Sequence, residues 1–140
     1  MKKQVFGISI LALLLFSGCE RQSLSEQNNE PPRPAIDLNA SIARAKTENK
    51  TVLLDFTGSD WCPPCMQLQK EVLSKPEFKT YAESNLIYHV VDFPRRFQLP
   101  PDVTATNNLL AEKFSIEGFP TLIALDGNGK EIWRQLGLSV

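Results

Sequence analysis

The sequence predicts an α/β domain in which a mixed sheet carries helices on both faces. Short apolar runs typical of buried strands alternate with segments of helical character along the last ~100 residues. The last two strand-like runs are joined by Asp126-Gly127-Asn128-Gly129, which is a strong hairpin signal. Alternating strands and helices favour parallel pairing, whereas a hairpin joins antiparallel strands, so we expect one sheet with both kinds of pairing.

Each expected element rests on a local signal. Asp37 or Asn39 can cap the first helix, and the nearly continuous apolar run at 51–57 indicates a strand buried on both faces. Proline marks two helix boundaries, because it is favoured in a first turn and cannot continue a helix. The expected elements are a helix ending near Glu48, a strand at 51–57, helices at 62–73 and 76–84, a second buried strand at 86–92, a helix at 104–114, and strands at 121–125 and 130–136.

The N-terminus has the pattern of an export signal. Met1-Lys2-Lys3 is positively charged, and the apolar run at 5–16 is too short for a membrane-spanning helix, which needs ~20 residues. The run Phe16-Ser17-Gly18-Cys19 resembles the lipobox of bacterial lipoproteins, except that Phe16 stands where leucine is usual. We therefore expect a signal peptide at 1–18 and lipidation of Cys19. An ordinary signal peptide with a coincidental cysteine is the alternative.

This signal sets the expected location and the organisation of the chain. The protein is expected in the cell envelope, anchored to a bacterial membrane with its domain outside the cytoplasm, facing the periplasm or on the cell surface. Residues 19–38 are rich in Ser, Gln, Asn and Pro and predict a flexible, lipid-anchored linker before one domain at 39–140. Removing residues 1–18 leaves 13 basic against 16 acidic residues, a formal charge of −3, so no basic patch indicates nucleic-acid binding.

The run Trp61-Cys62-Pro63-Pro64-Cys65 lies at a strand-to-helix junction and indicates a dithiol redox site. If Cys19 carries lipid, Cys62 and Cys65 can pair only with each other. A permanent structural disulfide and a two-thiolate copper(I) carrier are the alternatives. Otherwise no metal site is expected, because there is no second C-x-x-C and the single histidine, His89, is interpreted as a packed strand residue.

Three segments together resemble the thioredoxin superfamily. They are Leu54-Asp55-Phe56, Trp61-Cys62-Pro63-Pro64-Cys65 and Gly118-Phe119-Pro120-Thr121, and they occur in the order in which the family has them. The likeness covers about residues 39–136. Within it, residues 56–62 and 91–94 closely resemble an exported bacterial thioredoxin-like subgroup. The resemblance implies a thioredoxin-like α/β/α sandwich and a redox function.

The resemblance also implies a role for each matching residue. Cys62 matches the attacking cysteine and Cys65 the resolving cysteine, and Asp55 matches the buried acid that assists proton transfer. Trp61 matches the aromatic residue that flanks the site, and Pro120 matches the cis-proline. Phe119, which precedes that proline, matches the residue whose backbone forms hydrogen bonds with the substrate.

The sequence departs from the family pattern in three ways. One extra residue separates Asp55 from Cys62, and the loop at 93–103 is longer than usual and is placed to shape substrate access. The family's last helix is apparently missing before Val140, so one sheet face is expected to lose part of its cover. A partner, an atypical ending and a truncated chain are the three explanations.

The Pro63-Pro64 dipeptide bears on the direction of the chemistry. Neither proline has an N–H, so only the Cys65 amide remains to stabilise a Cys62 thiolate. A less acidic thiol favours reduction or isomerisation over oxidation. We therefore expect a membrane-tethered thiol-disulfide oxidoreductase, with no cofactor beyond the Cys62–Cys65 disulfide. A non-catalytic thioredoxin-fold binding module is the alternative.

The expected partners follow from this function. They are protein disulfide substrates, a membrane electron-donor protein and the membrane itself, with the protein a monomer that binds no nucleic acid. Four other side chains are given plain interpretations. Met66 and Trp133 are taken as packing residues of the core or its rim, and Arg95 and Arg96 as a solvated loop tip.

Overall fold

The computed structural model describes residues 34–138. The expected signal peptide at 1–18, the lipidation site Cys19 and linker residues 19–33 lie outside the described residues. The elements, in chain order, are α1 (Leu38–Glu48), β1 (Thr51–Thr57), α2 (Pro63–Leu68), the π-helical η1 (Gln69–Leu73), α3 (Pro76–Asn85), β2 (Leu86–Asp92), α4 (Pro101–Lys113), β3 (Thr121–Leu125) and β4 (Glu131–Leu136).

The sheet is mixed, as the sequence predicts. Its strand order is β2-β1-β3-β4, with β1 parallel to β2 and antiparallel to β3, and with β3 antiparallel to β4. β1 is buried along nearly its whole length. The prediction that β2 is a second fully buried strand is wrong, because β2 lies at the edge of the sheet in the described part of the chain and is largely half-buried.

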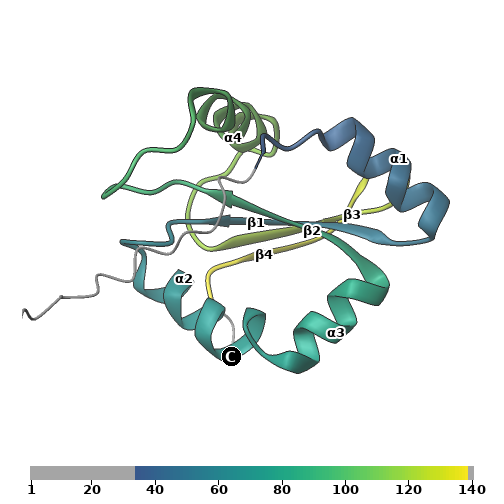
Figure 1. Ribbon diagram of the computed structural model, residues 1–140, viewed down its shortest axis with the longest axis horizontal. Helices are drawn as coiled ribbons and strands as arrows, with labels where there is room; N and C mark the ends of the chain where they lie inside the picture. Colours follow the sequence, from purple (N-terminus) through teal and green to yellow (C-terminus); the bar gives the residue numbers. More distant parts are fainter. Residues whose placement is uncertain (1–33, 139–140) are drawn as a thin grey trace, which may run out of the picture. The chain divides into compact units, whose positions relative to one another are not determined.

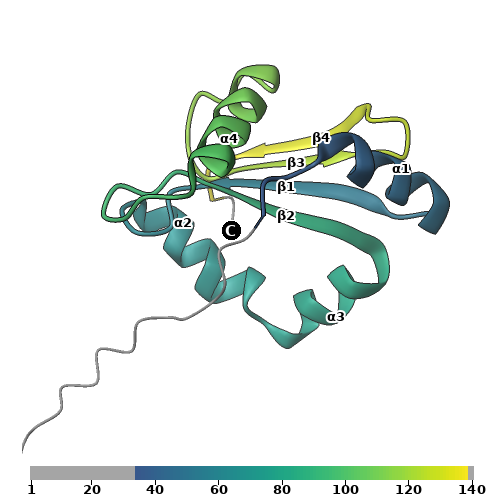
Figure 2. The same ribbon diagram turned by 45° about the horizontal axis from the view of Figure 1, so that its top comes forward.

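Helices cover both faces of the sheet. Figures 1 and 2 show α1 and α4 on one face and α2 and α3 on the other. The main apolar core lies under α1 and α4, where Leu54 and Phe56 of β1 are fully buried. Side chains alternate across a strand, so Leu53 and Asp55 point to the opposite face. The ring of Phe78 from α3 packs there against Tyr88 of β2, with centroids 5.6 Å apart.

Capping and proline explain the helix boundaries. Asp37 caps α1, accepting a hydrogen bond from the Ala40 amide at 2.9 Å. α4 begins at Pro101 instead of the expected Thr104, because a proline at the first helical position already has the required φ and loses no needed donor. The expected helix at 62–73 changes to π-type winding at Gln69, where the Ser74 amide bonds the Gln69 carbonyl at 2.9 Å.

The last hairpin leaves part of the sheet exposed. Asp126 organises its turn, since its carboxylate accepts from the amides of Asn128 and Lys130 at 2.9 Å, and Gly129 takes the positive φ of 78°. In β4, Trp133 is 47% exposed, and Met66 of α2 is 44% exposed. These exposures exclude both residues from the core and leave the interpretation of packing at its rim. Within residues 34–138, no helix combines the length and the apolar character that crossing a bilayer requires.

Candidate active site

The two cysteines lie at the start of α2 and are joined by a disulfide. Cys62 is the residue just before the helix, and Pro63 and Pro64 form its first two positions. Both cysteines are nearly buried, at 4% and 3% exposure. The Cys65 amide donates to the Cys62 sulfur at 3.3 Å, which is the one backbone donor that the two prolines leave in this turn.

A tight turn holds Trp61 beside the cysteines. The carbonyl of Gly58 accepts hydrogen bonds from the amides of Trp61 and Cys62, at 3.3 and 3.0 Å. The Trp61 ring lies so close to Gly58 that a Cβ there would sit 2.5 Å from Trp61 Cε2. Any larger residue at position 58 would therefore displace the indole from its place in this turn.

An aromatic cluster links the dithiol turn to the loop before β3. The Phe119–Pro120 peptide bond is cis, and the Phe119 ring stands perpendicular to Trp61 with centroids 5.8 Å apart. The Phe93 ring packs on Phe119 at 5.3 Å. The structure thus brings together Trp61 and Phe119, both proposed from the sequence, and adds Phe93. Within residues 34–138, the backbone N–H and C=O of Phe119 have no backbone hydrogen-bond partner.

Asp55 lies in the middle of β1 and is buried, with 2% exposure. Its Oδ2 accepts a hydrogen bond from the Tyr88 hydroxyl at 2.8 Å, and its Oδ1 has no partner among the described residues. Burial raises the pKa of Asp55 to about 6 from an ordinary value near 3.8, the Tyr88 hydrogen bond works against that rise, and the nearby Asp92 charge adds to it. Neither oxygen hydrogen-bonds to a cysteine within the described residues.

Tyr88 is a functional candidate that sequence reasoning missed. The β1–β2 pairing places Leu53 opposite Tyr88 and Asp55 opposite Val90. Residues two apart on a strand share a face, so Tyr88 and Asp55 are diagonal neighbours on the α3 side. The sequence signal that could have identified Tyr88 was the presence of a tyrosine on the strand next to that of Asp55. This signal becomes informative only when the register of the two strands is known.

The long loop after β2 is fixed against the dithiol turn. Asp60 accepts hydrogen bonds from the backbone amides of Arg95, at 3.0 Å to Oδ1, and Arg96, at 2.6 Å to Oδ2. The Trp61 Nε1 donates to the Phe93 carbonyl at 2.7 Å, and the Arg95 guanidinium lies 3.5 Å from the Trp61 ring centroid. Both arginines are exposed, as expected, but their backbone is held by Asp60 and differs in that respect from a free loop tip.

His89 packs where β2 meets α1. Its Nε2 lies 2.7 Å from the Ser41 hydroxyl, and burial followed by the charge of Arg44 lowers its pKa. Within residues 34–138, no three His, Cys, Asp or Glu side chains gather into a group suited to hold a metal ion. The histidine therefore contributes to the packing of the helix on the sheet.

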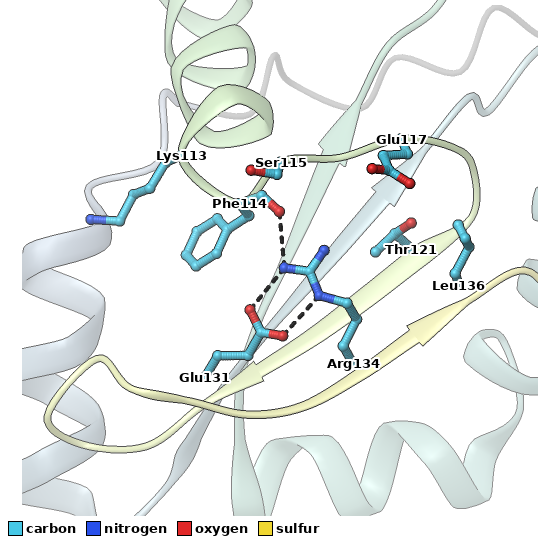
Figure 3. Close-up of a pocket in the computed structure, with 8 residues that line it drawn as sticks. All are labelled: Lys113, Phe114, Ser115, Glu117, Thr121, Glu131, Arg134 and Leu136. Carbon is cyan, nitrogen blue, oxygen red and sulfur yellow. Dashed lines mark hydrogen bonds and ion pairs between the residues drawn. The ribbon is translucent and has the colours of Figure 1, made fainter.

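A cavity of about 410 Å³ lies between the end of α4 and β4 (Figure 3). Arg134 fills one side of it, where its Nη2 donates to the Phe114 carbonyl at 2.9 Å and its Nε to Glu131 at 2.8 Å. Glu131 neutralises the guanidinium, so the pair ties the last strand to the end of α4. Neither cysteine nor Pro120 lines this cavity.

The comparisons with known proteins agree with this geometry. The sequence pattern of the family described as a thioredoxin-like domain matches residues 38–139. The chain is 31% identical over 134 residues to the disulfide bond reductase DsbH of Chlamydia pneumoniae, covering 91% of this chain and 81% of the relative. A solved structure of a DsbH oxidoreductase superposes with a TM-score of 0.66 at 29% identity, covering 84% of this chain and 82% of the other.

A second kind of relative is much longer than this chain. The thiol:disulfide interchange protein DsbD of Pseudoalteromonas atlantica is 34% identical over 96 residues. That match covers 69% of this chain but 15% of DsbD. The similarity therefore concerns one portion of that protein.

Proposed function

The chain belongs to the thioredoxin-like family and is a thiol-disulfide oxidoreductase of that family, and on this premise we propose that it reduces or isomerises protein disulfides outside the cytoplasm. The observation that carries the proposal is the disulfide between Cys62 and Cys65 at the start of α2, in a turn flanked by Trp61 and the cis Phe119–Pro120 bond. The printed name of DsbH, a disulfide bond reductase, supports the same direction.

The proposed reaction begins with the reduced form. The Cys62 thiolate attacks one sulfur of a substrate disulfide, so the substrate S–S bond breaks, one substrate sulfur leaves as a thiolate, and a mixed disulfide forms on Cys62. Cys62 is the attacking residue because it precedes α2, where the Cys65 amide points at its sulfur. Phe119 supports this step with a backbone N–H and C=O free to pair with an extended substrate segment.

The second step returns the protein to the disulfide form. Cys65 loses its proton, attacks the Cys62 sulfur, and releases the substrate as a dithiol that has gained two electrons. Asp55 is the proposed base for this proton. Its pKa of about 6 makes it mostly ionised at neutral pH while leaving it more basic than an ordinary aspartate. The reaction uses no cofactor besides the disulfide itself.

The prolines support reduction over oxidation. Strong oxidants owe their potential to a stabilised thiolate in the reduced form. Pro63 and Pro64 supply no N–H, so the Cys62 thiolate receives one backbone hydrogen bond in this turn. A thiolate stabilised by fewer donors is a better electron donor, and we therefore place this protein on the reducing side.

The proposed setting is the surface of a bacterial membrane. A lipid on Cys19 would anchor the domain through the linker at 19–38, and a membrane electron-donor protein would re-reduce the disulfide after each turnover. Membrane fractionation of cells that express the wild type or Cys19→Ser tests the anchor. The wild type is expected in the membrane fraction with a fatty-acylated N-terminal peptide by mass spectrometry, and the variant without it.

Insulin reduction tests the catalytic proposal. The wild type should accelerate insulin precipitation in the presence of a small-molecule thiol, and Cys62→Ser should abolish the acceleration. Cys65→Ser should retain substrate proteins as mixed disulfides on non-reducing gels, whereas Cys62→Ser/Cys65→Ser, the matched control, should retain none. A wild type that binds substrate without dithiol-dependent turnover would instead be a binding module.

A further inference from the structure

The loop between β2 and α4 forms an ordered wall beside the dithiol. Figures 1 and 2 show it next to the loop between β1 and α2. Asp60 holds the backbone amides of Arg95 and Arg96, and the Trp61 indole holds the Phe93 carbonyl. These bonds join segments more than thirty residues apart, so the backbone of the two arginines is fixed beside Asp60 and Trp61, which directly precede Cys62.

The arginine side chains bring positive charge to this wall, and the nearby Asp60 carboxylate offsets part of it, since its charge interacts with that of Arg96. Both are exposed, and in the described part of the chain neither forms an ion pair with a carboxylate. The carboxylate that contacts this loop belongs to Asp60, and its oxygens accept hydrogen bonds from the backbone amides of Arg95 and Arg96 and not from their guanidinium groups. The Arg95 guanidinium lies over the Trp61 ring, with its Cζ 3.5 Å from the centroid, and Trp61 immediately precedes Cys62.

This charge is opposite in sign to that of the chain, whose formal net charge is −1. A cationic rim on a protein with almost no net charge attracts anionic segments to that one place. Arg95 is also suited to this task, because a guanidinium can stack on an aromatic ring and still donate to a carboxylate in its own plane.

We propose that Arg95 and Arg96 select protein disulfides that carry acidic side chains close to the reacting cysteine. The inference rests on the proposed function and names the substrate class of the same site. In the encounter complex, a substrate carboxylate pairs with the guanidinium above Trp61 while the neighbouring substrate sulfur meets Cys62. The selection acts on association, so it weakens as salt screens the charges.

Two disulfide-loop peptides test the proposal, identical except for glutamate or glutamine on both sides of one cysteine. The reduced wild-type protein is mixed with each peptide at low salt, and the reaction is stopped with acid and separated by chromatography. The glutamate peptide is expected to react about three- to tenfold faster, as a single favourable charge pair allows. The ratio should fall towards one at about 0.5 M salt.

Matched variants assign the selection to the loop. Arg95→Gln should lower the ratio clearly, to what Arg96 alone supports, and Arg95→Lys should keep more of it because it keeps the charge. Lys79→Gln makes the same charge change at an exposed position on α3 and should leave the ratio as in the wild type. Circular dichroism checks that all variants are folded.

The outcomes separate the two proposals. Equal rates for both peptides, or a preference for glutamine, would overturn the selection by arginine and leave the reductase proposal standing. A ratio that Lys79→Gln lowers as much as Arg95→Gln would also overturn it, because net charge would then explain the effect. Failure to reduce either peptide would contradict the proposed function itself.

Discussion

Asp55 and Asp60 are two carboxylates five residues apart that the fold treats in opposite ways. Asp55 is buried in β1, where the Tyr88 hydroxyl is its one hydrogen-bond donor among residues 34–138, and burial raises its pKa to about 6. Asp60 is half-exposed in the following turn. The little burial it has raises its pKa, but the backbone amides of Arg95 and Arg96 outweigh this and lower the pKa overall. A carboxylate short of donors suits proton transfer, whereas one supplied with donors organises a loop.

The largest effect is expected from Asp55→Asn, which removes the proposed base. Release of substrate from the mixed disulfide should slow by about 10²-fold above pH 7, the usual scale of general-base catalysis. The wild-type rate of substrate release should show an inflection near pH 6, and the variant, which lacks the Asp55 carboxylate, should not show it. Rapid mixing and acid quenching, with chromatography of the mixed disulfide, measures this step.

A matched background isolates the role of Asp55. In the Cys65→Ser protein only the attack by Cys62 remains, so adding Asp55→Asn there should leave mixed-disulfide formation at a similar rate. If both steps slowed equally, the residue would be acting on the whole site and its assignment to Cys65 would be wrong.

The same residue should control how stability depends on pH. A buried acid whose pKa is raised in the folded state favours folding when protonated. The oxidised wild type should therefore lose up to about 3 kcal/mol of unfolding free energy as the pH rises from about 4 through about 6. Asp55→Asn should show a flatter profile over this range. Urea unfolding at a series of pH values measures the slope, and parallel profiles would contradict the raised pKa.

A smaller change is expected from Tyr88→Phe, which deletes the hydroxyl that donates to Asp55. That hydrogen bond favours the ionised carboxylate, so its loss should raise the Asp55 pKa by about one further unit. In a plot of the rate of substrate release against pH, the inflection should move to higher pH. The maximal rate reached above the inflection should stay similar. Phe keeps the ring that packs on Phe78, so an unmoved inflection would show that Tyr88 serves packing alone.

The smallest effect is expected from Asp60→Ala, which frees the amides of Arg95 and Arg96. The thermal midpoint should fall slightly at neutral pH. Because the folded-state pKa of Asp60 is lowered, this contribution is present above its ordinary pKa and is lost as the pH falls through the lowered value. The kinetic inflection near pH 6 should remain. Asp60→Asn keeps an acceptor for the amides and should fall between Asp60→Ala and the wild type.

Local signals in the sequence were enough to place most of the elements. The apolar run at 51–57 and the Asp126-Gly127 turn are short-range patterns, and the strands at 51–57, 86–92 and 121–125 lie where the sequence predicts them. The shift to π-type winding at Gln69 has no such signal in the sequence.

The candidate site was less predictable, for a physical reason. The cysteines are close in sequence, and their disulfide could be anticipated from that spacing. The Tyr88–Asp55 bond depends on the register of two strands, and the bonds from Asp60 to the later loop span 35 or 36 residues. Contacts at such separation are set by packing of the whole domain, so neither the donor to Asp55 nor the anchoring of Arg95 could be read from the chain.

Because Trp61 immediately precedes Cys62, its fluorescence is expected to report on the redox state of the dithiol. An excited indole beside a disulfide can pass an electron to it, so the oxidised protein should emit weakly and brighten when Cys62 and Cys65 are reduced. Trp133, the second of the two tryptophans, is exposed on β4 and adds a background that Trp133→Phe would remove. Every turnover, and every encounter that displaces Arg95 from the ring, would then be visible in real time without a label.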